Sequence, residues 1–114
     1  MNHRPEPGRY YYIHSQPSLL TESLLKTLQP PNRPQPIRLT KPWLTSFGFR
    51  PDASAHSWIR DDSRLVPGLN CWVCVATRRY IKFVHELQDW YLEVYGEELS
   101  LTESALHRLV SYAS

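Results

Sequence analysis

The sequence predicts an α+β fold, in which a small antiparallel sheet of about three to four strands is packed by one long helix at about 80–95 and by two or three short helices. Three observations predict it. Residues 80–95 are apolar on one side at the helical period, a threonine flanked by leucines recurs three times, and short runs of β-branched and aromatic residues alternate with turn signals between 57 and 75. The 114 residues suffice for a single domain, which we expect to span 9–114 behind a flexible segment at 1–8.

Composition and charge exclude several classes of protein. Hydrophobic residues make up 41% of the chain and charged residues 21%, and no apolar run approaches the roughly 20 residues that a membrane-spanning helix needs. We therefore expect no membrane insertion and, because the start of the chain has no signal-peptide pattern, a cytoplasmic protein. The net charge of +2 is too small to bind nucleic acid by bulk electrostatics, but basic residues dominate before residue 50 and acidic ones after 85, which predicts two charged poles.

The first predicted element is a tyrosine-rich strand at 9–14. Side chains alternate along a strand, so we expect Tyr11 and Ile13 to face the core and Tyr10 and Tyr12 to cover a rim. Three successive tyrosines also suit base stacking, which keeps Tyr10 and Tyr12 as candidate contacts for a nucleic acid or another partner.

Three threonines each lie at the expected start of a short helix, namely Thr21, Thr40 and Thr102. Each hydroxyl can accept a hydrogen bond from the free amides of the first turn, and each threonine has one leucine just before it and another four residues after it. For the last helix, Ser100 with Glu103 is a competing capping pair. The second helix is predicted to end near Phe47, with Gly48 as its left-handed terminator.

A proline-rich segment at 29–36 separates the first two helices. Its four prolines exclude a helix or a central strand. We expect a stiff connector, and the alternative, a ligand for an aromatic groove, stays open.

A β-meander is predicted between 57 and 75, with one strand around 57–60 and another that contains Cys71 and Cys74. The two-residue spacing of these cysteines resembles a redox or half-zinc motif, but residues three apart on a strand point to opposite faces. We therefore expect two buried, inert thiols, no metal site and no cofactor, because the five histidines are scattered as well.

The helix at 80–95 is the strongest local pattern. Its polar residues share one narrow arc, with His85 at the margin and with Lys82, Glu86, Asp89 and Glu93 inside it. The opposite side is apolar and should be embedded as scaffold, including Phe83, Leu87, Trp90 and Tyr91. Gln88 is polar within that apolar sector and is expected to hydrogen-bond a buried backbone group, while Gly96 ends the helix.

Several of these segments together resemble a known family. They are Pro36-Ile37-Arg38-Leu39-Thr40, Trp43-Leu44, Phe47-Gly48-Phe49, the run from Tyr80 to Gln88 followed by Tyr91, and Gly96-Glu97-Glu98-Leu99. They resemble small uncharacterised proteins of phages and mobile elements of Bacteroidetes-type bacteria, which share the pattern PI-x-LT, GF, YIK(F/Y)VH(E/Q)LQ-x-x-Y and GEEL. The resemblance spans 36–99 and implies a phage or mobile-element context without an established activity.

An enzyme needs acid, base or nucleophilic groups that converge. The two candidate pairs are His85 with Asp89 and Glu97 with Glu98. Both are expected at the solvent surface, where such pairs are common, so we predict no catalytic residue and no enzyme.

Nucleic-acid binding is the first alternative, because Arg78, Arg79 and Lys82 cluster with Tyr80 and Phe83. These residues would supply phosphate contacts beside rings that stack on bases. The helical period argues against this alternative, since it places Tyr80 and Phe83 in the buried sector of the long helix.

The leading prediction is a non-catalytic binding protein whose partner is an unknown protein or small ligand. Seven tyrosines and four tryptophans exceed what a core of this size needs, and rings with a polar edge are favoured at recognition surfaces. The resemblance implies an accessory or counter-defence role. An open sheet edge would also allow the protein to form a homo-oligomer.

Overall fold

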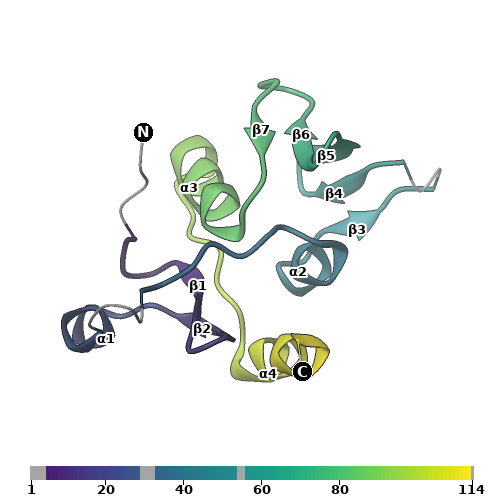
Figure 1. The fold of residues 1–114 in the computed structure, drawn as a ribbon. Helices are drawn as coiled ribbons and strands as arrows, with labels where there is room; N and C mark the ends of the chain where they lie inside the picture. The colour runs from purple at the N-terminus through teal and green to yellow at the C-terminus, as the bar shows by residue number, and fades with distance from the viewer. Residues whose placement is uncertain (1–4, 29–32, 54–55, 114) are drawn as a thin grey trace.

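A computed structural model describes residues 5–28, 33–53 and 56–113 of the chain. Within these residues the fold has seven strands and four helices, which are α1 (Glu22–Thr27), α2 (Lys41–Ser46), α3 (Val84–Tyr95) and α4 (Glu103–Ala113) (Figure 1). The predicted α+β class is confirmed. None of the helices in these ranges combines the length and the apolar character needed to cross a lipid bilayer.

The main sheet is an antiparallel meander of five strands, namely β3 (Arg50–Pro51), β4 (Trp58–Arg60), β5 (Ser63–Gly68), β6 (Cys71–Cys74) and β7 (Tyr80–Ile81). Each strand pairs with the next one along the chain. Both edge strands are only two residues long. Strands β4 and β6 lie where the sequence predicts strands, whereas β5 covers residues that the turn signals place between them. All four helices lie on the lower and left sides of this sheet as drawn in Figure 1.

One face of the sheet forms the core together with α2 and α3. Leu65, Trp72, Cys74 and Ile81 are buried on this inner face and belong to one apolar cluster with residues of both helices, including Trp43, Phe47, Leu87 and Trp90. The indole Nε1 of Trp72 donates a hydrogen bond to the Leu39 carbonyl at 2.9 Å. The position of the cysteines in a strand is confirmed, and both thiols are free. Cys74 is buried as predicted, but Cys71 is only half-buried, because it points to the other face of the sheet.

A second, two-stranded sheet is formed by β1 (Tyr10–Ile13) and β2 (Gln16–Leu19). His14 and Ser15 connect them with φ angles of 52° and 66°, as a two-residue hairpin turn requires. The Gly8 amide donates to the Leu20 carbonyl at 2.8 Å, and the Glu6 amide donates to the Tyr11 hydroxyl at 3.2 Å. Part of the segment predicted to be flexible, 1–8, is therefore held against the hairpin.

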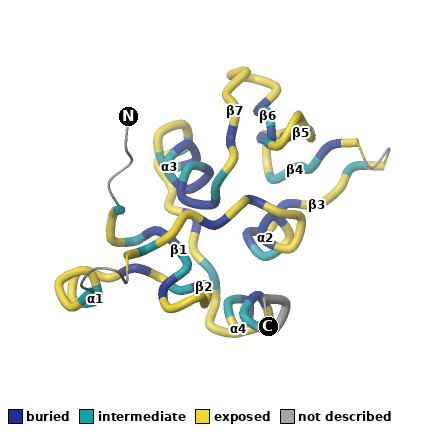
Figure 2. The backbone as a smooth tube through the Cα atoms, in the orientation of Figure 1, coloured by how far each residue is buried: buried dark blue, intermediate teal, exposed yellow. Residues whose placement is uncertain are grey.

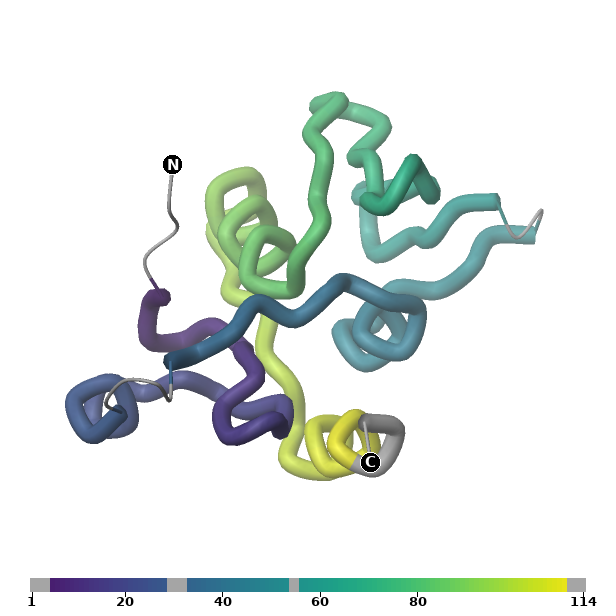
Figure 3. The backbone as a smooth tube through the Cα atoms, viewed as in Figure 1, coloured from purple at the N-terminus to yellow at the C-terminus, as the bar shows by residue number. Residues whose placement is uncertain are grey.

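The segment from 35 to 39 connects the hairpin to the main sheet through backbone hydrogen bonds (Figure 3). Gln35 and Tyr12 exchange two backbone hydrogen bonds of 2.9 Å. Farther along, the Leu39 amide donates to the Lys82 carbonyl, and the Val84 amide donates to the carbonyl of Ile37. The second half of the predicted connector thus runs beside β1, whereas 29–32 lie outside the described residues.

The long helix is present but begins at Val84, later than the sequence pattern predicts, because Tyr80–Ile81 pairs with β6. The Glu86 carboxylate fixes this start by accepting hydrogen bonds from the Lys82 and Phe83 amides at 2.9 and 3.0 Å. The helix ends at Gly96, whose φ of 69° is left-handed and whose amide donates to the Leu92 carbonyl, as predicted.

The scaffold role of α3 is confirmed by its burial (Figure 2). Leu87, Trp90 and Tyr91 are at most 1% exposed, and Phe83 is half-buried at the N-cap. The prediction that His85 lies at the solvent margin is wrong, since this residue is 3% exposed. Its ring stacks between Tyr11 and Phe83, at centroid distances of 5.3 and 5.7 Å, because the β1–β2 hairpin covers that side of the helix.

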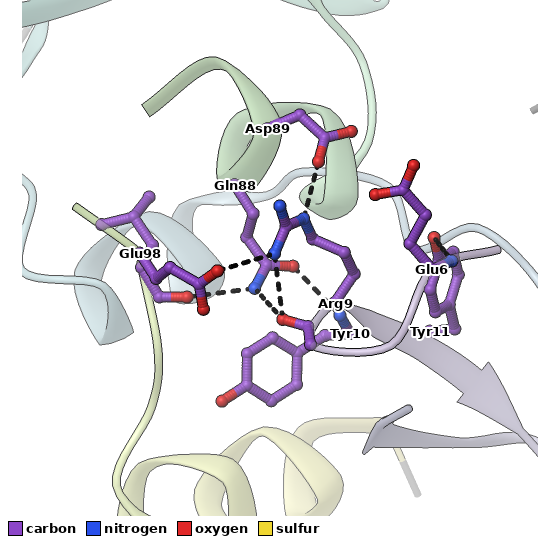
Figure 4. A network of polar contacts seen from close by, with 9 residues as sticks. Glu6, Arg9, Tyr10, Tyr11, Gln88, Asp89 and Glu98 are labelled. Atoms are coloured by element: carbon purple, nitrogen blue, oxygen red, sulfur yellow. Dashed lines mark hydrogen bonds and ion pairs between the residues drawn. The ribbon is translucent and has the colours of Figure 1, made fainter. Parts of the chain in front are cut away.

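A buried polar network joins the hairpin to α3 (Figure 4). The Gln88 side chain accepts a hydrogen bond from the Tyr10 amide at 3.0 Å and donates to the carbonyls of Gly8 and Leu99 at 3.2 and 3.0 Å. The prediction that Gln88 bonds buried backbone groups is therefore confirmed. Beside it, Arg9 donates from Nε to Asp89 at 2.6 Å. Burial disfavours the charged guanidinium, but the bond to Asp89 and the negative charges of Asp89, Glu98 and Glu6 together outweigh this effect, so the pKa of Arg9 is raised.

The predicted helix caps are confirmed at two of the three threonines. The Thr21 hydroxyl accepts from the Leu24 amide and the Thr102 hydroxyl from the Ala105 amide, both at 3.1 Å, so Thr102 caps α4 in preference to Ser100. Thr40 occupies the N-cap of α2, but its side chain makes no capping bond.

The predicted terminator of α2 is confirmed at Gly48, which has a φ of 95°. Its amide donates to the Thr45 carbonyl at 3.0 Å, and the Phe49 amide donates to the Leu44 carbonyl at 2.9 Å. This pair of bonds is the Schellman arrangement that ends a helix.

Candidate binding surface

The predicted cationic cluster is divided by the fold. Arg78 is exposed in the turn between β6 and β7, and Lys82 is exposed just after β7. Arg79 instead turns to α3, where its Nη1 lies 2.8 Å from Oε2 of Glu93 and lowers the pKa of that carboxyl group. In the part of the chain that the structure describes, Arg78 and Lys82 pair with no carboxylate.

Tyr80 lies beside these cations and is 70% exposed. The sequence pattern predicts a buried position in the long helix, and this prediction is wrong because the residue belongs to edge strand β7. Ile81 occupies the inward position there and is fully buried. Side chains alternate along a strand, so Tyr80 points to the opposite side of the sheet.

That opposite side is the outer face of the sheet, defined here by Ile59, Arg64, Val66, Val73 and Tyr80. Residues paired across antiparallel strands share a face, and the pairing joins Ile59 to Arg64 and joins Val66, Val73 and Tyr80 in one row. These side chains are half-buried or exposed. The helices pack on the inner face, so the outer face is open to a partner (Figure 1).

Four cationic side chains lie along the ends and edges of the sheet, and we call them the cationic rim: Arg38, Arg50, Arg78 and Lys82. All four are exposed. Arg38 and Lys82 line one shallow depression of about 230 Å³, together with Gly68, Asn70 and Cys71. The Arg38 guanidinium donates to the Asn70 carbonyl at 3.2 Å, which holds it near the turn between β5 and β6.

The acidic groups of α3 that lie near this rim are engaged in bonds of their own. Glu86 binds backbone amides, Asp89 binds Arg9, and Glu93 binds Arg79. On the side of the outer face, Asp52 pairs with Arg64 at 3.0 Å. Asp61 lines a second depression together with Arg50, so the unbalanced positive charge of the rim lies at Arg38, Arg78 and Lys82.

The tyrosines of β1 do not form a second exposed surface. Tyr10 is 2% exposed, so the prediction that it covers a rim is wrong, while Tyr12 is half-buried. The Tyr10 hydroxyl accepts from the Leu101 amide at 2.8 Å, and burial raises the pKa of this phenol. The reason is that β1 is covered on both faces: Tyr10 packs in the main core with residues of α2, and Tyr11 and Ile13 pack with leucines in and beside α1.

The candidate catalytic pairs differ in their exposure. His85 is buried beside the rings of Tyr11 and Phe83, and Asp89 accepts a hydrogen bond from Arg9. Glu97 and Glu98 are exposed, and Glu98 lies 3.7 Å from Arg9. Among the described residues no group of three His, Cys, Asp or Glu side chains is placed to hold a metal ion.

Comparisons with other proteins do not decide the family. No family model, no curated protein and no solved structure matches the chain. The resemblance to phage and mobile-element proteins therefore stays a prediction.

Sequence reasoning missed most of the outer face. Ile59, Val66 and Val73 are typical of any strand, and their exposure follows from the pairing of strands and from where the helices pack. Arg38 is 32 residues from Asn70 in the sequence, so nothing local indicates that the two meet. Residues 63–66 alternate between buried and more exposed positions, as in a strand with one face toward the core and one toward solvent. The matching alternation of side chains in the sequence was the one available signal for this strand.

Proposed function

We propose that this protein is a non-catalytic binding protein, which contacts an anionic partner through the outer face of its five-stranded sheet. One observation carries the proposal. Tyr80, a large ring with a polar tip, stands 70% exposed beside half-buried valines on a sheet face that no described helix covers. Such a mixture of aromatic and aliphatic groups is favoured at recognition surfaces.

The charge of the surface selects the kind of partner. The rim presents four exposed cations, and Asp52 is already paired with Arg64. Complementary potentials speed up association and exclude partners of like charge, so the contacting region of the partner should be acidic or carry phosphate.

The sheet edges favour contact through the face over self-association through strand pairing. Strand β3 is two residues long and contains Pro51, which has no amide to donate. The other edge strand, β7, continues into the segment that pairs with 37–39. Homo-oligomer formation through an edge remains the less favoured alternative.

We further propose that the protein acts as an accessory factor of a phage or mobile element in the cytoplasm, with counter-defence as one such role. The resemblance over 36–99 supports this context. His85 is 3% exposed and Asp89 bonds to Arg9, and both observations support a role without catalysis.

Affinity capture from cells that encode the protein tests the proposal. Tyr80→Glu replaces the exposed ring of the outer face by a negative charge. Leu25→Glu is the control, because it places a negative charge at an exposed apolar residue of α1, away from the sheet. We expect a partner that wild type and Leu25→Glu retain and that Tyr80→Glu loses. Retention of the same molecules by all three proteins would contradict the proposal.

A further inference from the structure

The outer face combines an exposed ring with cations, which are the groups that bind one class of anionic partner. Proteins that bind single-stranded nucleic acid without strong sequence preference combine exposed aromatic rings, on which bases stack, with cations that follow the phosphate backbone. Tyr80 supplies the ring, and Lys82 lies two residues farther along, about 7 Å away in an extended chain.

We propose that the outer face binds single-stranded DNA or RNA, an inference that rests on the proposed function and names its partner. Tyr80 stacks on a base, while Lys82, Arg38 and Arg78 contact phosphates on either side of it. The depression lined by Arg38 and Lys82 brings the first two cations together, and Arg78 stands two residues before the ring.

The shape of the surface favours single strands over duplex. A base pair within a duplex hides the faces of its bases, so a ring such as Tyr80 has no stacking partner there unless the strands separate. Readers of duplex DNA insert a helix or a two-stranded ribbon into the major groove. The exposed Tyr80 instead lies on a broad five-stranded sheet, whose neighbouring outer-face residues are aliphatic.

The backbone at Arg78 allows a variant that removes the side chain and keeps the turn. Arg78 has a φ of 57°, a left-handed conformation that disfavours most side chains and that glycine adopts freely. The described residues offer its guanidinium no carboxylate partner. Glycine suits this conformation, so Arg78→Gly removes the cation without disturbing the turn.

The test measures binding of fluorescent 12-residue oligonucleotides at 50–200 mM salt, with single-stranded DNA, single-stranded RNA and duplex DNA as separate arms. Three phosphate contacts predict a slope of about −2 in log affinity against log salt, or roughly 20-fold weaker binding across that fourfold range. Tyr80→Leu should weaken single-strand binding about tenfold. Whichever single strand binds more tightly identifies the natural source of the ligand.

Charge-matched variants separate a specific site from general attraction. Lys82→Glu should weaken binding, whereas Lys26→Glu, the same change on exposed α1, should not. Arg78→Gly should lower affinity and make the salt slope less steep by about 0.7, while the unfolding midpoint is maintained. Circular dichroism and urea unfolding confirm that each variant is folded.

Absence of single-strand binding at 50 mM salt, equal affinity for duplex, or equal losses with Lys26→Glu and Lys82→Glu would each overturn this inference. If single strands fail to bind while the captured partner of the previous test still depends on Tyr80, the partner is another anionic molecule and only the proposed function stands. If capture is also independent of Tyr80, both proposals fail.

Discussion

Replacing Gln88 with alanine should destabilise the fold strongly, although Gln88 touches no ligand. The side chain is 1% exposed and satisfies three backbone groups, the Tyr10 amide and the Gly8 and Leu99 carbonyls. The Gly8 carbonyl keeps a weak bond from Arg9 at 3.4 Å, so two groups lose their partner. An unsatisfied buried polar group costs about 1–3 kcal/mol, which gives a loss of about 3 kcal/mol in the free energy of unfolding.

Urea unfolding monitored by tryptophan fluorescence measures this loss. Total stabilities of single domains are about 5–15 kcal/mol, so Gln88→Ala should remain folded with a clearly lower midpoint. Gln16→Ala, the same substitution at an exposed position of β2, is the control and should change stability by less than about 0.5 kcal/mol. Equal midpoints for the two variants would refute the idea that Gln88 joins the hairpin to α3.

Three further predictions concern stability. Gly48→Ala should lower the free energy of unfolding by about 2 kcal/mol, because Gly48 has a φ of 95° and an added Cβ would lie 3.3 Å from Arg60 Nε. Gly96→Ala has open space around it and should lower the free energy of unfolding by about 1 kcal/mol. Thermal unfolding compares the two variants, and equal losses would contradict the argument. Thr21→Ala should cost about 1 kcal/mol and Thr40→Ala almost nothing, as measured by urea unfolding, since only Thr21 makes a capping bond. Burial raises the pKa values of the Tyr10, Tyr11 and Tyr91 phenols, so above about pH 10 the unfolded chain releases protons that the folded chain retains. Free energies of unfolding measured between about pH 8 and 11 should therefore fall as the pH rises. A flat profile would contradict the prediction that these phenols are buried.

The interior of α3 could be predicted from the sequence because its periodicity directly reflects burial. The helical period places Leu87, Trp90 and Tyr91 on one side and marks Gln88 as polar within it, and all four are buried. The ends of the helices could also be predicted, because caps and terminators depend on hydrogen bonds within a few residues. They are the caps Thr21 and Thr102 and the terminators Gly48 and Gly96.

Features that depend on distant contacts could not be predicted in this way. The apolar run before α3 continues the helical period, but pairing with β6 makes Tyr80–Ile81 a strand and exposes Tyr80. His85 is polar and lies at the edge of the apolar sector, yet a hairpin more than 70 residues earlier in the chain covers it. Arg9 and Asp89 meet across 80 residues. The outer face follows from the order of the strands, which local patterns do not encode.

The most direct test of the binding surface is a map of amide chemical shifts in the ¹⁵N-labelled protein during titration with a single-stranded 12-residue oligonucleotide. We expect the largest changes at Val66, Val73, Tyr80 and Lys82, with α1 and α4 unaffected. Changes concentrated on α1, α4 or the β1–β2 hairpin, or no changes at saturating oligonucleotide, would contradict the account.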